Sequence, residues 1–236
     1  MRTVIAGCAA AWSLPALAPL WPGLRCTLRI PGRIHEEAVA CLTFDDGPHP
    51  QGTPAVMEAL DLANAKATFF CVGEQVRREP SLAAELVGAG HAVEVHGDRH
   101  RNQLRLSPVA VADDLRRGAE AIAEATGRWP GYHRPPYGIF SAGSLAATRR
   151  LGFAPLLWSR WGRDWRRDAT PEEIAQLVSA DVKAGDILLL HDSDAYSAPG
   201  SWRATAAALP MILDSLARQQ LAPATLPSPA KASISG

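Results

Sequence analysis

Short apolar runs alternate with segments of helical periodicity along most of the chain. The runs predict strands at 38–44, 66–72, 91–95, 154–158 and 186–190, with a weaker one just before Arg134. Between them, hydrophobic residues recur with helical spacing over roughly 53–65, 81–89, 108–126, 141–151, 170–184 and 201–220. Because the strands are apolar nearly throughout, they indicate a parallel sheet covered by helices. This pattern fits either a barrel or a doubly wound sheet.

The composition is that of a globular protein. The chain has 236 residues, of which 47% are hydrophobic and 20% charged, and its formal net charge is zero. This length suits one sizeable core better than two domains. The lack of a basic excess argues against nucleic-acid binding, and no G-x-G-x-x-G follows the first strand to support a dinucleotide fold. Cys41 and Cys71 lie inside apolar runs, so we expect buried free thiols.

The two ends of the chain differ from its central part. Residues 1–30 carry Arg2 and then no charge before Arg25, which is typical of an export signal or a membrane anchor. This favours an extracytoplasmic protein, secreted or anchored at the cell envelope. The alternative is an apolar arm that packs on the domain. Residues 227–236 are rich in Ala, Pro and Ser and are predicted to form a loose tail.

Polar residues with useful chemistry follow five of the predicted strands. In chain order they are Asp45 and Asp46, His96 and His100, Arg134 and Tyr137, Asp164 and Trp165, and His191. The carboxyl ends of parallel strands meet at one edge of a sheet, so we expect these residues to form a single site. A buried polar group needs a partner, and five such strand ends are hard to explain by structure alone.

The histidines at positions 96 and 100 indicate a metal. In a helical turn their spacing puts both rings on one face. Two imidazoles and one carboxylate suit a divalent metal with an open position for water. Such an ion would also explain why Asp45 and Asp46 stand side by side despite their like charge. The spacing does not say which aspartate binds the metal.

The remaining strand-end residues can supply acid–base chemistry. The second aspartate could act as a general base, since a metal lowers the pKa of water to about 7. His191 could protonate a leaving group, and Asp164 could orient it and keep it protonated. Arg134 could hold the base carboxylate through a strong directional ion pair. A surface ion pair with Arg163 or Arg166 is the alternative for Asp164.

Five motifs occur in an order that resembles a known family. They are TFDDGP (43–48), HGDRH (96–100), RPPYG (134–138), RDW (163–165) and LLLHD (188–192). Over residues 38–226 the chain resembles the polysaccharide deacetylase family, also called carbohydrate esterase family 4 or the NodB homology domain. The resemblance implies an α/β fold, a distorted and incomplete (β/α) barrel. It also implies one divalent metal, zinc first and cobalt or nickel as alternatives. The family hydrolyses N-acetyl groups, rarely O-acetyl groups, on polymers such as chitin, peptidoglycan or xylan.

The resemblance also assigns roles to the candidate residues. It implies that Asp45 is the general base and is held by Arg134, and that the metal ligands are Asp46, His96 and His100. The Tyr137 backbone N–H would be an oxyanion donor, and His191 would be the general acid, tuned by Asp164. Trp165 and Leu189 would form the walls of the acetyl pocket. The expected partner is a carbohydrate polymer, not a nucleic acid, and the expected state is a monomer. Membrane association would come from the N-terminal segment.

Two positions depart from the family pattern. Gly97 stands where a Ser or Thr hydroxyl usually steadies the metal loop, which puts the rigidity of that loop in question. Trp161 replaces an Asp, and it could stack on a sugar ring or simply fill space. His49 is expected at the rim rather than as a ligand. Alternative substrates are a lipid-linked sugar, deacetylated or deformylated, or a small amide. A non-catalytic carbohydrate-binding protein has least support, because no motif residue is lost.

Overall fold

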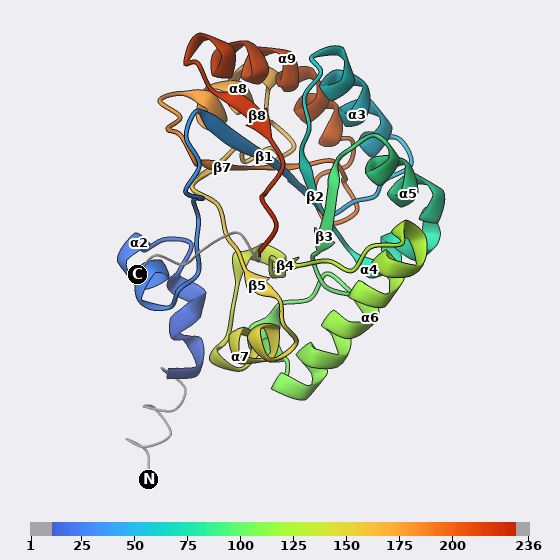
Figure 1. Cartoon of the computed structure of the whole chain (residues 1–236), viewed down its shortest axis with the longest axis vertical. Helices are drawn as coiled ribbons and strands as arrows, with labels where there is room; N and C mark the ends of the chain where they lie inside the picture. Colours follow the sequence, from blue (N-terminus) through green and yellow to red (C-terminus); the bar gives the residue numbers. More distant parts are fainter. Residues whose placement is uncertain (1–10, 230–236) are drawn as a thin grey trace.

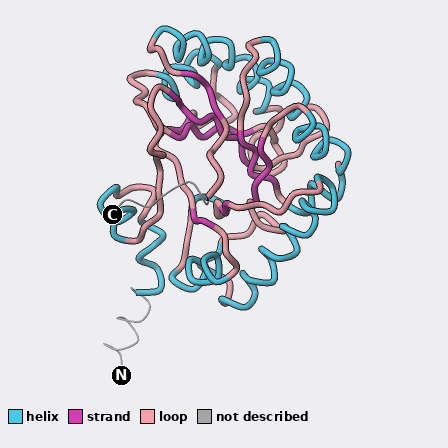
Figure 2. The backbone as a smooth tube through the Cα atoms, viewed as in Figure 1, coloured by secondary structure: helices cyan, strands magenta, loops and turns pink. Residues whose placement is uncertain are grey.

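The strands form one sheet at the centre of the molecule, and the helices lie outside it (Figures 1 and 2). The computed structural model describes residues 11–229. The strands are β1 (Val39–Asp45), β2 (Thr68–Cys71), β3 (Ala92–Val95), β4 (Tyr132–His133), β5 (Ala154–Pro155), β6 (Arg160–Trp161), β7 (Ile187–His191) and β8 (Ala222–Ala224). Their order is β5-β4-β3-β2-β1-β7-β6, with β8 beside β1. Every paired strand in the described part of the chain runs parallel to its neighbour.

The helices follow the predicted alternation with three differences. They are α2 (Pro22–Thr27), α3 (Gly52–Leu62), α4 (Gly73–Arg78), α5 (Pro80–Gly88), α6 (Pro108–Thr126), α7 (Ala142–Arg150), α8 (Pro171–Ser179) and α9 (Trp202–Arg218), with 3-10 turns η1 (Leu14–Leu17), η2 (Gln103–Arg105) and η3 (Pro136–Gly138). The helices α2 and α4 were not predicted. Pro80 begins the separate helix α5 at its first turn. The helix α8 ends before residue 184, because Ala180 is already extended.

The apolar run 154–158 is not one strand, as the sequence indicated, but a crossing between the two edges of the sheet. The chain leaves β5 at one edge and forms β6 at the other. Within residues 11–229, no ladder joins β5 to β6, so the barrel is incomplete, as predicted. The crossing segment partly fills the gap: the Leu157 N–H donates to the Pro31 carbonyl at 2.9 Å. The run is apolar because it is buried, and a segment can be buried without forming the hydrogen bonds of a strand.

Two apolar cores cover the two faces of the sheet and explain its continuous hydrophobic strands. On the outer face, Phe44 and Phe69 stack with ring centroids 5.0 Å apart beneath the surrounding helices. On the inner face, Cys41 and Phe70 belong to a second cluster inside the barrel. Cys41 and Cys71 are both buried free thiols, which confirms that prediction.

Residues 11–30 pack against the domain. The Trp12 indole N–H donates to the Leu104 carbonyl at 3.3 Å, and Ala18 and Ile30 join the core inside the barrel. None of the described helices is long and apolar enough to cross a bilayer. Residues 1–10 lie outside the described part, so export or anchoring remains a prediction. Most of the predicted loose tail, residues 230–236, also lies outside it.

Candidate active site

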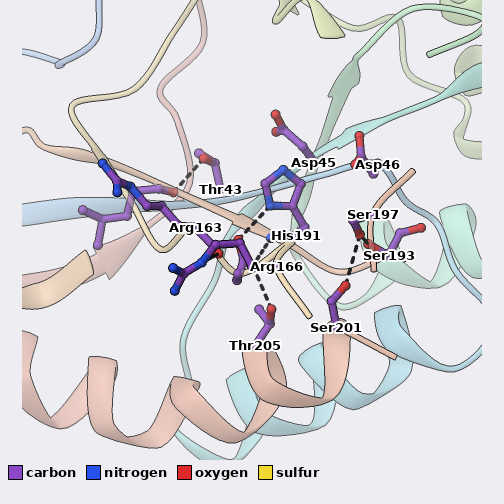
Figure 3. A network of polar contacts seen from close by, with 12 residues as sticks. Thr43, Asp45, Asp46, Arg163, Arg166, His191, Ser193, Ser197, Ser201 and Thr205 are labelled. Atoms are coloured by element: carbon purple, nitrogen blue, oxygen red, sulfur yellow. Dashed lines mark hydrogen bonds and ion pairs between the residues drawn. The ribbon is translucent and has the colours of Figure 1, made fainter. Parts of the chain in front are cut away.

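A cavity of about 300 Å³ opens at the carboxyl ends of the central strands. In the described structure it is lined by Asp45, Asp46, His96, His100, Tyr137, Gly138, Trp158, Trp161, Trp165, Leu189, His191, Tyr196 and Ser197. Arg134 and Asp164 lie fully buried and contact residues of this lining. The register explains the convergence, because Asp45 at the end of β1 lies opposite His191 at the end of β7. Figure 3 shows Asp45, Asp46 and His191 grouped together at this edge.

Asp46, His96 and His100 form the candidate metal site. One ligand atom from each residue lies within 4.8 Å of the others. The Asp46 Oδ1 atom is 3.4 Å from His96 Nε2 and 3.3 Å from His100 Nε2. The His96 Nδ1 atom lies 2.8 Å from the Arg134 carbonyl oxygen, which can only accept a hydrogen bond. In the neutral ring the proton therefore sits on Nδ1, and the Nε2 lone pair faces the carboxylate.

The charges at this site fit a divalent cation. Within residues 11–229, the buried Asp46 Oδ1 and His100 Nδ1 atoms have no hydrogen-bond partner. Burial lowers the pKa of His100 to about 4, although Asp46 opposes this, so the ring is neutral and its lone pair is free. Two imidazoles and one carboxylate are a donor set for zinc or a similar ion. His49 is not in this set; its Nε2 atom lies 3.1 Å from Asp194.

Ion pairs hold the loop between the two histidines. Gly97 has φ +107°, a conformation that favours glycine, and a Cβ there would lie 2.9 Å from Asp114 Oδ2. The Asp98 backbone N–H donates to the same Asp114 oxygen at 2.9 Å. Both aspartates are buried and pair with arginines: Asp98 with Arg77 and Arg117, and Asp114 with Arg101. The loop is thus fixed without a hydroxyl at position 97.

Asp45 is held from one side by a buried arginine. Its Oδ1 atom accepts a hydrogen bond from Arg134 Nη1 at 2.6 Å. The same nitrogen donates to Thr43 Oγ1 at 2.9 Å, and the guanidinium lies 4.0 Å from the centroid of the Phe70 ring. The Asp45 Oδ2 atom lies 3.9 Å from His96 Nε2, next to the candidate metal site. One carboxylate oxygen is therefore anchored and the other faces the metal ligands.

His191 is held by a buried carboxylate. Asp164 Oδ1 lies 2.8 Å from His191 Nδ1, and Asp164 Oδ2 accepts from the His191 backbone N–H and from Thr205 Oγ1, both at 2.7 Å. Thr205 lies on α9 beside His191 (Figure 3). Burial would lower the pKa of His191, but the Asp164 charge outweighs it and raises the pKa to about 10. The surface alternative for Asp164, a pair with Arg163 or Arg166, is wrong for this fully buried side chain.

Aromatic side chains form the cavity wall beside His191. The Trp165 ring meets the His191 ring edge-on at 5.6 Å, and Trp161 lies 5.4 Å from Trp165. Leu189 adds an aliphatic surface. Trp161 is partly exposed and lines the cavity, so it is placed where a sugar ring could contact it. Sequence reasoning missed Trp158, which lies 5.7 Å from Trp161.

Two tyrosines enclose His100. Tyr196 stacks on its ring at 4.3 Å, and Tyr137 meets it edge-on at 4.5 Å. The Tyr196 hydroxyl donates to Glu74 at 2.7 Å, which fixes its ring. Tyr137 has φ +62°, an uncommon conformation for a bulky residue and one that clusters at functional sites. Tyr196 was missed because it lies in the loop between β7 and α9, beyond the last residue of the strand.

The comparisons with known proteins agree with this geometry. A family model described as polysaccharide deacetylase matches residues 32–156. The chain is similar to a chitooligosaccharide deacetylase of Bradyrhizobium sp. (strain ANU 289), at 37% identity over 152 residues, which is 64% of this chain and 69% of the relative. It is also similar to a peptidoglycan-N-acetylglucosamine deacetylase of Bacillus cereus, at 35% identity over 188 residues, 78% of this chain and 84% of the relative.

A solved structure matches the same fold. It is a family 4 carbohydrate esterase from Streptomyces lividans in complex with acetate. The TM-score is 0.74 at 30% sequence identity, and the match covers 84% of this chain and 97% of the other. The likeness therefore extends over most of the incomplete barrel.

Proposed function

This chain belongs to the polysaccharide deacetylase family, whose members are hydrolases, and we propose on that basis that it removes N-acetyl groups from a chitin-like or peptidoglycan polymer. One observation carries the proposal. The donor set of Asp46, His96 and His100 lies in a single cavity between the Arg134–Asp45 pair and the Asp164–His191 pair. Hydrolysis of an amide needs these three components: an electrophilic centre, a base and an acid.

The proposed cofactor is one divalent metal, most simply zinc. Two imidazole nitrogens and one carboxylate oxygen leave a position open, as in catalytic zinc sites. Cobalt and nickel accept the same donors. When bound, such an ion polarises a carbonyl and lowers the pKa of water.

Asp45 is proposed as the general base. Its Oδ1 atom is occupied by Arg134, so Oδ2 is the oxygen that takes the proton from the attacking water. The paired guanidinium keeps the carboxylate oriented during this step. Opposite it, the backbone N–H of Tyr137 would donate to the oxygen on which negative charge develops. The next two N–H groups, of Gly138 and Ile139, are already bonded to carbonyls of Pro135 and Pro136.

His191 is proposed as the general acid. Its Nδ1 atom is bonded to Asp164, so Nε2 is the atom that delivers a proton to the departing amine. Its raised pKa keeps the ring protonated at neutral pH. Trp165 and Leu189 supply an apolar wall that suits the methyl of an acetyl group.

A lipid-linked acetylated sugar is the second candidate substrate. The observation that favours it is the exposed apolar surface at Leu20 and Trp21. Pro19, which precedes them in the chain, lies close to Gly138, which lines the cavity. A substrate with a lipid tail could contact both surfaces at once.

Acetate release tests the proposal. The purified chain is assayed with N-acetylglucosamine oligomers and with peptidoglycan, after chelation and again after adding zinc or cobalt. We expect release that is lost on chelation and restored by metal. No release from either substrate, with metal bound at one ion per chain, would contradict the polymer assignment and favour the lipid-linked sugar. Release that survives complete chelation would overturn the metal-dependent mechanism.

A further inference from the structure

Exposed apolar side chains are concentrated in one short stretch near the N-terminus. Leu14, Leu17, Leu20 and Trp21 are 43%, 49%, 75% and 59% exposed. They are four of the nine exposed large hydrophobic residues in the described structure, yet they come from only about eight consecutive positions. We call these four residues the arm patch. Such a concentration marks an interaction surface, whereas single exposed hydrophobics do not.

The arm patch is the outer face of a segment whose inner face is fixed. The leucines at 14, 17 and 20 follow a three-residue spacing, while Pro15 and Ala18 between them are buried. Downstream, the Arg25 guanidinium donates to the Trp158 carbonyl, and Leu24 is buried. The arm patch therefore has a defined position on the domain. Figure 1 shows this segment at the lower left, protruding from the barrel beside α7.

Positive charge borders the arm patch. The sequence has no charged residue from position 3 to 24, and Arg25 and Arg29 follow directly. Arg149 of α7 lies against them, with its guanidinium 3.3 Å from the Arg29 carbonyl oxygen. Among the ion pairs of residues 11–229, neither Arg29 nor Arg149 has a carboxylate partner. Burial and the Arg29 charge lower the pKa of Arg149, so an anion here would be favourable.

We propose that the arm patch docks on the surface of an anionic membrane. Leucines and a tryptophan with flanking arginines match the interface of a bilayer, where apolar side chains enter the acyl boundary and arginines meet lipid phosphates. A second copy of the chain fits this face less well, because two-fold symmetry would bring the unpaired arginines of both copies together. This inference does not depend on the proposed function.

Docking would bring the catalytic cavity near the membrane. A Cβ added to Gly138 would lie 3.4 Å from Pro19 Cγ and 2.5 Å from the Trp158 ring, so the arm directly borders the cavity rim. A polymer bound in the cavity would then lie close to the lipid headgroups. The geometry suits a glycan that is attached to, or assembled at, a membrane surface.

Vesicle sedimentation with the full chain tests the docking surface. The probes are phosphatidylcholine vesicles with and without about a third phosphatidylglycerol. The test variant is the double substitution Leu20→Ser and Trp21→Ser. The matched control is Trp129→Ser, because Trp129 is 57% exposed but lies away from the arm. We expect binding to the anionic vesicles, a loss of about tenfold or more in the double variant, and wild-type binding in the control.

The far-UV circular dichroism spectrum and the thermal unfolding midpoint should be unchanged in the double variant, which separates lost docking from misfolding. Three results would overturn the inference. The first is no binding to anionic vesicles. The second is wild-type binding by the double variant, which would assign binding to residues 1–10 instead. The third is self-association that the double variant abolishes, which would assign the arm patch to a second copy of the chain.

Discussion

The cavity contains two arrangements of histidine and aspartate that differ in what joins them. At the Asp164–His191 pair, a carboxylate oxygen and Nδ1 lie 2.8 Å apart and share a proton. At Asp46, the carboxylate oxygen lies 3.3 to 3.4 Å from two Nε2 atoms, and the Arg134 carbonyl keeps the His96 proton on the far side of the ring. The first arrangement is complete without an ion, whereas the second leaves the His96 Nε2 lone pair facing a carboxylate.

The pKa values of the histidines in the two arrangements shift in opposite directions. Asp164 raises the pKa of His191 to about 10 against the effect of burial, whereas burial lowers the pKa of His100 to about 4. The same residue types can therefore hold a proton or a metal within one cavity. The deciding factor is which neighbour occupies the second ring nitrogen and the second carboxylate oxygen.

The largest expected effect comes from His96→Ala. This change removes one of the ligands that distinguish the metal arrangement, so we expect metal content to fall close to zero. A bound ion stabilises the transition state by several kcal/mol, so kcat should fall by at least about 10³-fold. Elemental analysis together with acetate release measures both. A variant with full metal content would contradict the ligand assignment.

A large effect with normal metal content is expected for His191→Ala. Loss of the general acid should lower kcat on the order of 10²-fold or more, while metal content and KM stay near wild type. The control is His49→Gln, since His49 contacts Asp194 and lies outside the cavity lining. Wild-type turnover in the His191 variant would remove this residue as the acid.

A smaller and more diagnostic effect is expected for Asp164→Asn. In the wild type Asp164 raises the pKa of His191, so the protonated acid persists above pH 6.5 and is lost only as pH rises through the raised value. Replacing the charge should lower that pKa, so the alkaline limb of the kcat profile should move to lower pH. The profile is measured with the metal-loaded enzyme. An unchanged alkaline limb would show that this limb does not report the titration of His191, which would contradict the prediction.

The smallest effect is expected for Asp114→Asn. Asp114 accepts the Asp98 backbone N–H and pairs with Arg101, so its loss loosens the loop between the two histidines. We expect metal affinity to weaken by about tenfold, with near-normal kcat at saturating metal. The matched control is the neighbouring Asp113→Asn, whose half-exposed side chain pairs with Arg116. Equal metal affinity in both variants would contradict a positioning role for Asp114.

The sequence predicted the parts of the site that follow from strand order. Parallel strands deliver their last residues to one edge, so Asp45 and His191 were expected together before β1 and β7 were known to be neighbours. The helix positions were predicted by periodicity, because each helix covers a buried strand. The resemblance of five motifs then divided the paired aspartates into base and ligand.

The parts that were missed depend on contacts without a local signal. Thr205 and Asp114 lie on helices and reach their partners across 41 and 16 residues, with no strand end to mark them. The run 154–158 was assigned to one strand because its hydrophobicity records burial alone. It fills the gap of the barrel instead of continuing a ladder. Tertiary contacts, not local pattern, determine such positions.

The most direct test compares metal content in Asp45→Asn and Asp46→Asn. The two residues are adjacent, and both substitutions remove one charge with little change in volume. Our account predicts about one metal per chain in the Asp45 variant with no turnover, and almost none in the Asp46 variant. Metal loss from the Asp45 variant, or retention by the Asp46 variant, would contradict the division of this pair into a base and a ligand.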